Sequence, residues 1–443
     1  MESSILRLSV LGVVLSVVAG CGGSPSGGTG GSANLTTITY SFSNPAPAAV
    51  AVKIGSGSFT AATVTGGALS FTLPDGTNDF GVAYVCPGFS PFPGDVEALE
   101  FLRYNTALDD TKYAGGCLSS ASGGSGGTGS SGTLTGSVNT SAFASADWLF
   151  VSALGANSGV GSSFNLPLNG GFSLTDAPTG TDNVVLQLYD SSLNAIAVKG
   201  AGAQAVPGAL NGGNAIDFAA SDATTLQPMS FLNVPAGYST PSTTVIANSK
   251  QLNAVLQMNL GVLSGSTITQ YPVLPAGIAE IGDQYDFQAQ VSKLTGSVDS
   301  TVNAGTTESV SAQGAGPVSI SFPAPWVYSG PTPAALPTFA FDYPGFGSQS
   351  GAEYTSEFLW TPGAGIDDQI EITLSQTYQG ATSSVTVPDL SAIPGFLAAP
   401  GSGTTVSWSA TVVEVPSNAE PSTSSSLVGL GASVSNGGTY TVP

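Results

Sequence analysis

The chain of 443 residues carries 28 acidic and 7 basic side chains and no histidine, which leaves a net charge of −21. This charge argues against nucleic acid or a bare anionic lipid surface as a partner, and the lack of histidine excludes Ser-His-Asp triads, Cys-His pairs and the usual zinc sites. Only 8% of the residues are charged, while 41% are hydrophobic and 59 are glycine, which is typical of an exported all-β protein and not of a disordered one.

The first residues have the organisation of an export signal. Arg7 precedes an apolar run over residues 8–18, and two small residues separate this run from Cys21. The run is too short and wrongly flanked to remain as a membrane span. With the cysteine directly after the small residues, the segment resembles the lipobox of bacterial lipoproteins. The resemblance implies a signal peptide over residues 1–20, cleavage before Cys21, and lipidation of Cys21 with a diacylglycerol and usually a further acyl chain such as palmitate.

The resemblance also bears on location. Gly22 stands where an aspartate usually retains such proteins in the inner membrane, so it favours the outer membrane of the cell envelope. Residues 21–32 then form a lipidated cysteine and a flexible Gly/Ser-rich tether. The partners that we expect are the membrane, through the N-terminal lipid, and an unknown surface protein or glycan.

Residues 33–121 predict a first β-sandwich domain. Apolar and hydroxylated residues alternate from the start, as in residues 38–42, which is the pattern of half-buried strands. Residues 95–104 fit a helical face as well as a strand, and we favour a strand because the neighbouring segments are strands. Cys86 and Cys117 remain as a pair once the first cysteine is lipidated, and an oxidising compartment would join them in a disulfide.

Residues 122–132 contain only Ser, Gly and Thr and therefore predict a linker to a second sandwich domain over residues 133–225. Turn residues of the first domain return at a constant offset of 104 positions in the second. The matching residues are Gly67, Pro74, Gly76, Thr77, Asn78 and Asp79 in the first, and Gly171, Pro178, Gly180, Thr181, Asp182 and Asn183 in the second. A constant offset indicates two copies of one unit.

The second copy carries a family resemblance. Its segments at residues 134–138 and 171–181 resemble the carboxypeptidase regulatory-like, transthyretin-like sandwich of bacterial surface proteins. The resemblance implies a small Greek-key sandwich without catalytic residues of its own. An immunoglobulin-like sandwich would leave similar traces, so both remain open. The predicted fold class is therefore all-β, with tandem Greek-key sandwiches on a flexible N-terminal tether.

Residues 226–443 predict a larger C-terminal β-region, of one lobe or two. The opening of the second domain, Leu-Thr-Gly-Ser-Val, recurs at residues 294–298. Residues 427–434 and 439–442 predict a closing hairpin over an Asn-Gly-Gly turn.

No catalytic residues and no enzymatic activity are expected. Glu353 and Glu357 are the carboxylate pair that a glycosidase could use. Residues four apart on a strand share one face, so we interpret the pair as a polar outer face over an aromatic inner one. Acidic turns could ligate calcium, but none has the spacing of a dedicated loop, and no metal site or cofactor is assigned. These turns hold Asp75, Asn78 and Asp79, Asp182 and Asn183, Glu280 and Asp283, and Asp367 and Asp368.

Two classes of function follow. The favoured one is a lipid-anchored surface protein with structural or adhesive sandwich domains. The alternative is a glycan-binding module in which Trp326, Tyr328 and Tyr343 form an exposed stacking platform for sugar rings. Alternating aromatics are more typical of a sandwich core, as expected here for Phe341 and Trp360, so the burial of Trp326 distinguishes the two.

Overall fold

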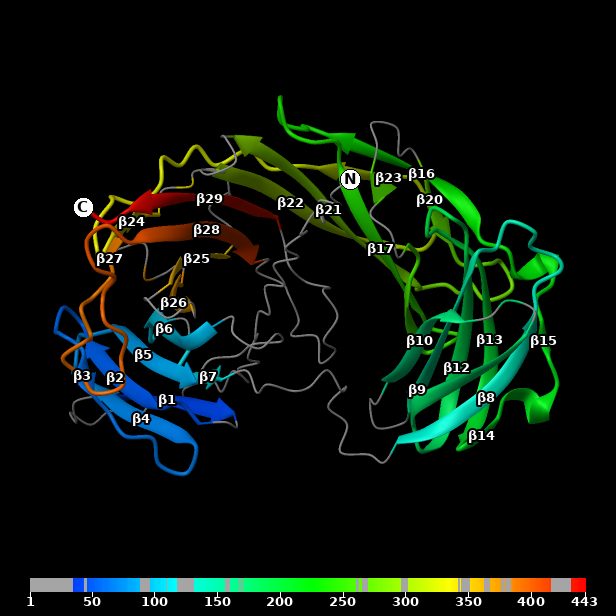
Figure 1. Cartoon of the computed structure of the whole chain (residues 1–443), viewed down its shortest axis with the longest axis horizontal. Helices are drawn as coiled ribbons and strands as arrows, with labels where there is room; N and C mark the ends of the chain where they lie inside the picture. Colours follow the sequence, from blue (N-terminus) through cyan, green and yellow to red (C-terminus); the bar gives the residue numbers. More distant parts are fainter. Residues whose placement is uncertain are drawn as a thin grey trace, which may run out of the picture.

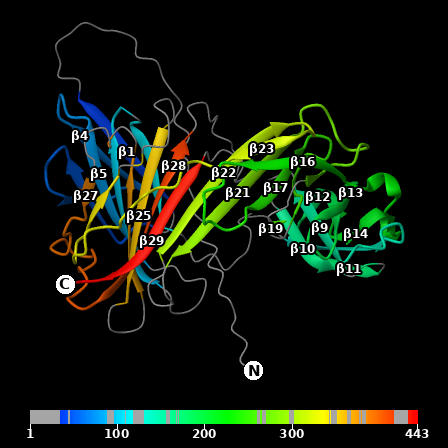
Figure 2. The ribbon, with the colours of Figure 1, turned by 90° about the horizontal axis from the view of Figure 1, so that it is seen from above.

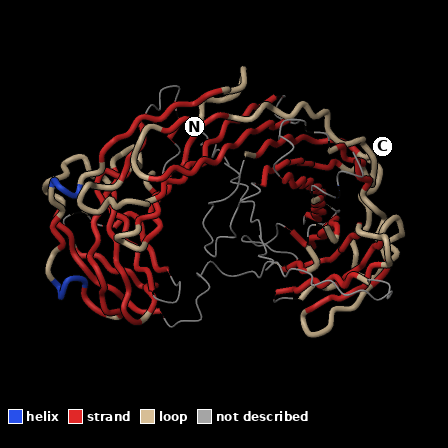
Figure 3. The backbone as a smooth tube through the Cα atoms, turned by 180° about the vertical axis from the view of Figure 1, so that it is seen from behind, coloured by secondary structure: helices blue, strands red, loops and turns tan. Residues whose placement is uncertain are grey.

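The computed structural model confirms an all-β fold built from several sheets. It describes residues 35–43, 46–87, 96–108, 110–117, 131–155, 160–166, 168, 170–259, 263–264, 270–295, 302–341, 343, 351–361, 367–375, 378, 384–415 and 432–443. Strands dominate these residues, with two short 3-10 turns at Leu210–Gly213 and Ala220–Asp222 (Figure 3). Within these ranges there is no helix whose length and apolar character would let it cross a bilayer. The signal segment, Cys21 and the tether fall outside the described residues, as does most of the linker.

The first unit, residues 36–116, is a sandwich of seven strands. They are β1 (Thr36–Ser43), β2 (Ala49–Ile54), β3 (Thr60–Ala61), β4 (Ala68–Leu73), β5 (Asp79–Pro87), β6 (Val96–Thr106) and β7 (Lys112–Gly116). One sheet has the order β4-β1-β7, with β7 parallel to β1, and the other runs β3-β2-β5-β6. The prediction of a strand near residues 95–104 is thereby confirmed.

The second unit, residues 131–217, repeats this order. Its strands are β8 (Ser131–Asn139), β9 (Trp148–Gly155), β10 (Val160–Leu166), β11 (Gly171–Pro178), β12 (Gly180–Tyr189), β13 (Ala195–Val206), β14 (Gly208–Ala209) and a short β15 (Ile216–Asp217). The sheets run β11-β8-β14 and β10-β9-β12-β13, with β14 parallel to β8. The offset of 104 seen in the sequence places β11 on β4 and β12 on β5, so the internal repeat is a repeat of structure.

A third unit with the same order covers residues 225–321. Its strands are β16 (Thr225–Leu232), β17 (Ser242–Ser249), β18 (Ala254–Gln257), β19 (Leu263–Ser264), β20 (Gln270–Val273), β21 (Gln284–Thr295), β22 (Val302–Gln313) and β23 (Val318–Ser321). The sheets run β20-β16-β23, with β23 parallel to β16, and β18-β17-β21-β22. The Leu-Thr of residues 294–295 ends β21, which is equivalent to β5 of the first unit. The Leu-Thr of residues 134–135, in contrast, lies in β8, the first strand of the second unit. The sequence echo therefore does not mark a repeat boundary.

The last strands form a fourth unit of the same design. They are β24 (Thr338–Ala340), β25 (Gly351–Trp360), β26 (Asp367–Leu374), β27 (Ser384–Thr386), β28 (Thr405–Val415) and β29 (Ser433–Thr441). The first and fourth strands pair as β24-β27, and the other sheet runs β26-β25-β28-β29. No seventh strand is found for this unit in the described part of the chain.

The units join edge to edge. The β22-β29 pair links the third unit to the fourth in antiparallel fashion, and the parallel β26-β6 pair links the fourth to the first. The result is one 13-stranded sheet. This sheet runs through the first, fourth and third units. In Figure 1 the four units form an arch, with the first unit at one end and the second unit at the other, and the view from above in Figure 2 shows the same order.

The junction gives the sheet of the first unit two buried faces. Val82 and Tyr84 point into the core of the first sandwich, whereas Ala83, Leu102 and Tyr104 point into the aromatic core of the fourth unit. Since β5 and β6 thus serve two cores, the segment predicted as the first domain shares its sheet with the C-terminal region.

The second unit packs sideways on the third. The outer face of β12 and β13 contributes Val185, Tyr189 and Val198 to the core of the third unit. The Tyr189 hydroxyl donates to the carbonyl oxygen of Gln257 over 2.7 Å, and the Ala195 N–H donates to that of Met258 over 2.9 Å. The second unit thereby covers β18, the third strand of the third unit.

The predicted C-terminal hairpin is wrong. β29 runs without a turn through Asn436 to Gly438 and pairs with β28 along its whole length. The Asn436 side-chain amide donates to the carbonyl oxygen of Trp326 over 2.9 Å, and the indole of Trp408 packs directly on Gly438. The Asn-Gly-Gly sequence thus makes room for side chains of the core and does not form a turn.

Candidate functional site

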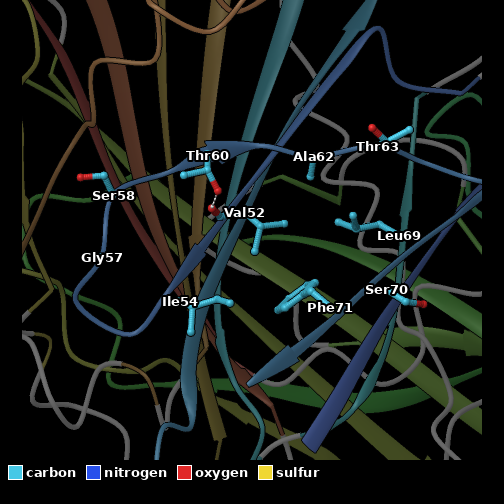
Figure 4. Close-up of a pocket in the computed structure, with 10 residues that line it drawn as sticks. All are labelled: Val52, Ile54, Gly57, Ser58, Thr60, Ala62, Thr63, Leu69, Ser70 and Phe71. Atoms are coloured by element: carbon cyan, nitrogen blue, oxygen red, sulfur yellow. Dashed lines mark hydrogen bonds between the residues drawn. The ribbon is translucent and has the colours of Figure 1, made fainter. Parts of the chain in front are cut away.

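An uncharged groove opens at the mouth of the first sandwich, between the β2-β3 hairpin and β4. It encloses about 470 Å³ and lies between the edges of two sheets (Figure 4). Its lining residues are Val52, Ile54, Gly57, Ser58, Thr60, Ala62, Thr63, Leu69, Ser70 and Phe71. None of these side chains can ionise, so the groove suits an uncharged ligand.

The groove has an apolar floor and a hydroxylated rim. Val52 and Leu69 are buried, and Phe71 is half-buried with its ring 5.4 Å from that of Phe80 in edge-to-face contact. The exposed Thr60 hydroxyl donates to the carbonyl oxygen of Val52 over 3.3 Å. This combination of an apolar floor with a few fixed polar groups is common in binding sites. Sequence analysis missed it, because its only local sign is the glycine-rich turn that precedes a very short strand.

A second feature is a charged cluster on the face of the β25-β26-β6 sheet that is opposite the aromatic core of the fourth unit. Arg103 forms an ion pair of 2.6 Å with Glu371 and also donates to the Thr373 hydroxyl. Burial raises the pKa of Glu353, an effect that Arg103 opposes and Glu371 adds to. Burial and Glu371 also raise the pKa of Glu357, whose carboxylate accepts a hydrogen bond of 3.1 Å from Ser409.

This geometry supports the interpretation of the carboxylates as the outer face of β25. Glu353 and Glu357 lie on the face opposite Tyr354 and Phe358, which belong to the aromatic core. Within the described ranges no cluster of three or more metal-ligating side chains occurs. The Arg103–Glu371 ion pair places an ion-pair network at the junction between the first and fourth units.

The aromatic residues predicted as a sugar platform are core residues. Trp326 is 4% exposed and Tyr343 8%, and both belong to the core of the fourth unit, against which the partly buried Tyr328 packs. Trp326 stacks on Tyr328 at 4.7 Å between ring centroids. Sugar rings require open aromatic faces, so these residues do not form the platform. Phe341 and Trp360 are buried, as predicted.

The acidic turns serve local structure. The Asp283 carboxylate accepts hydrogen bonds from the backbone N–H groups of Lys250 and Glu280, at 2.8 and 2.7 Å. Asp182 is 1% exposed, and burial raises the pKa of its carboxyl group. Asn183 donates to the carbonyl oxygen of Leu252. These contacts are those of turn and junction residues.

The disulfide between Cys86 and Cys117 is present, which confirms the predicted pairing. Both residues are buried in the core of the first unit. The bond ties β5 to the residue that follows β7, so it connects the two sheets of the sandwich.

The chain shows little similarity to known proteins. No family model matches the chain, and no curated protein does. Among solved structures, fervidolysin from Fervidobacterium pennivorans, a keratinolytic enzyme related to subtilisin, shares 18% identity over 45% of this chain and 30% of that one, with a TM-score of 0.14. The pilus adhesin SpaC from Lactobacillus rhamnosus GG shares 8% identity over 77% of this chain and 44% of that one, also with a TM-score of 0.14. The chain spans less than half the length of either structure, and scores this low carry no argument about function.

Proposed function

We propose that this protein is a lipid-anchored component of the outer membrane whose β-sandwich units have a structural or adhesive role and no catalytic one. The observation that carries the proposal is the recurrence of one strand order in four consecutive units. Three of these units share a continuous sheet, and repeated units joined in this way make a stiff body, which suits a protein that holds a surface at a distance from its anchor.

The strand order also bears on the family. In an immunoglobulin sandwich the first, second, fifth and fourth strands share a sheet. Here the first strand pairs with the fourth and seventh, and the second pairs with the third and fifth. This order favours the transthyretin-like alternative, in keeping with the turn motif at residues 178–181. We propose that the units belong to that architecture.

The anchor is tested by Cys21→Ser, because the lipobox offers no other residue for the acyl chains. The variant should leave the membrane fraction and appear as a soluble protein, whereas the wild type floats with membranes in a density gradient. Metabolic labelling with an alkyne-tagged palmitate should mark the wild type alone. A variant that still floats with membranes would refute the lipoprotein proposal.

A structural or adhesive role predicts that deletion of the protein alters the cell surface. Cells that lack it should lose adhesion or envelope integrity, and wild-type protein should restore either, while the soluble Cys21→Ser form should not. Equal restoration by the soluble form would contradict a role that depends on anchoring.

A further inference from the structure

The groove of the first unit lies beside its short third strand, on the side that faces the fourth strand. In the second unit the third strand, β10, spans Val160–Leu166 and lies beside the fourth strand, β11. In the first unit the third strand, β3, has two residues, and the groove opens between it and β4. β3 pairs with β2 as β10 pairs with β9, but over two residue pairs only, and no strand in the described part of the first unit closes the gap between β3 and β4.

The backbone at this edge presents its polar groups outward. The Ala62 N–H donates to the carbonyl oxygen of Val50 over 2.8 Å, and Thr60 pairs with Val52. Because successive residues of an antiparallel strand direct their backbone groups to opposite sides, the N–H and C=O of Ala61 point away from β2. No further strand pairs with β3 or with the outer edge of β4 in the described part of the chain.

The corresponding edges elsewhere in the chain are covered. In the fourth unit the third strand, β26, takes β6 of the first unit along eight residue pairs. In the third unit the edge at β18 is covered by side chains and backbone of the second unit. One of these edges is thus covered by strand pairing and the other by side-chain packing and hydrogen bonds, whereas the edge at β3 ends the 13-stranded sheet.

We propose that this groove binds an extended, uncharged peptide strand of another protein, which adds to β3 and directs alternate apolar side chains onto Val52, Leu69 and Phe71. The groove lining carries no charge, so an uncharged segment fits it. The chain as a whole carries a net charge of −21, so two copies of it would repel each other outside the groove, which argues against a second copy as the partner. Main-chain hydrogen bonds would supply affinity, and the apolar floor would select alternating side chains. The inference rests on the adhesive part of the proposed function and names its partner class.

The probe is a synthetic peptide with the sequence of residues 160–166, Val-Gly-Ser-Ser-Phe-Asn-Leu, with both ends blocked, because this uncharged strand lies beside the fourth strand of the second unit, as the peptide would lie beside β4. It is titrated against the full chain carrying Cys21→Ser, by fluorescence anisotropy of a labelled peptide. A peptide in which both serines are glutamate serves as the charged comparison. We expect the uncharged peptide to bind and the charged one to bind at least tenfold more weakly.

The deciding variant is Ala61→Pro, which removes the outward N–H at an edge position where proline is tolerated. It should weaken peptide binding about tenfold, the equivalent of one or two lost hydrogen bonds. Ala46→Pro, at an exposed residue of the same unit outside the groove, should leave binding unchanged. Equal binding by both variants would overturn the proposal, as would failure of the uncharged peptide to bind the wild type.

Hydrogen exchange gives a reading that does not depend on the variant being folded. Bound peptide should slow exchange in segments 57–64 and 68–73 of the wild type and leave the second unit unchanged. Binding without protection of these segments would place the peptide elsewhere and refute the groove. Because the experiment uses the soluble form, its failure is separable from failure of the lipid anchor.

Discussion

Arg103 of β6 and Glu371 of β26 form an ion pair of 2.6 Å across the parallel strands that join the first unit to the fourth. The two side chains are 25% and 18% exposed, and they are 268 positions apart in the sequence. This contact between distant segments helps to fix the position of the first unit relative to the fourth.

Loss of this pair should loosen the junction. Arg103→Met should cost about 2 to 4 kcal/mol of unfolding free energy, because it leaves buried carboxylates without their cation, and Glu371→Gln should cost less. The double variant should cost less than the sum, with a coupling of about 1 kcal/mol or more by urea denaturation. The same cycle on Lys199 and Asp222, a 2.7 Å pair between β13 and the 3-10 turn at Ala220–Asp222, is the control. Strict additivity at Arg103 and Glu371 would contradict a coupled junction.

The shared sheet also predicts how fragments behave. A fragment of residues 33–121 should aggregate when expressed alone, because Ala83, Leu102 and Tyr104 would expose the face that the fourth unit covers. Mixing it with a fragment of residues 225–443 should give a stable complex by size-exclusion chromatography. Leu102→Asp should abolish the complex, while Thr72→Asp, at an exposed position of β4, should not. A monomeric, folded 33–121 fragment would contradict the shared core.

Local features of the fold were predictable from the sequence because they depend on neighbouring residues. Alternation located the strands, and the turn chemistry at Pro74 and Pro178 revealed the first two copies of the unit. The core position of Trp360 followed from its place on the same strand face as Phe358. The cysteine pair followed from export and from the count of three cysteines.

The remaining features depend on contacts between distant segments. The pairing of β6 with β26 has no local signal, because many strands of this chain could pair with either edge. One sign was present: β6 carries large apolar side chains on both faces, with Leu102 and Tyr104 on one and Leu99 and Phe101 on the other, as expected for a strand buried on both sides. The Asn-Gly-Gly of β29 led to the wrong prediction of a hairpin, because the local sequence does not show that the indole of Trp408 packs on Gly438 and leaves no room for a side chain there. The groove could not be foreseen, since it results from the short length of β3.

The contact between Trp408 and Gly438 gives a direct test of the continuous β29. A Cβ atom added at Gly438 would lie 3.1 Å from Nε1 and 3.2 Å from Cζ2 of the indole. Gly438→Ala should therefore cost about 1 to 3 kcal/mol through overpacking. Gly401→Ala, where no atom lies within 4 Å of the added carbon, is the control and should be near neutral. Equal effects on the melting temperature would support a solvent-exposed hairpin instead.

The disulfide should contribute to the stability of the first unit. It closes a loop with a sequence separation of 31 residues. In the chain-entropy model such a loop stabilises the fold by about 3 to 4 kcal/mol. Cys86→Ala with Cys117→Ala should lower the melting temperature, and reductant should lower that of the wild type but not of the variant. Free thiols in unreduced protein from the periplasm, detected by mass spectrometry, would contradict the bond.

Glu100 should make the protein more stable in mild acid than in mild base. Its carboxyl is 1% exposed and accepts a hydrogen bond of 3.2 Å from the Leu397 N–H. Burial raises its pKa from 4.5 to about 7, with the Leu397 bond opposing and Asp368 adding to the shift. The folded state therefore holds this proton more tightly than the unfolded state does. The stabilisation is complete below about pH 4.5 and is lost as the pH rises to about 7.

Glu100→Gln keeps the acceptor and removes the charge. It should raise the unfolding free energy at pH 8 by up to about 3 kcal/mol and have little effect near pH 4.5, as measured by urea denaturation across this range. Burial and Glu414 raise the pKa of Glu308 to about 7 as well, so part of the pH dependence should remain in this variant and diminish when Glu308→Gln is added. A Glu100→Gln protein that is less stable than the wild type at pH 8 would show that the carboxylate is charged and stabilising in the folded state, contrary to the burial described.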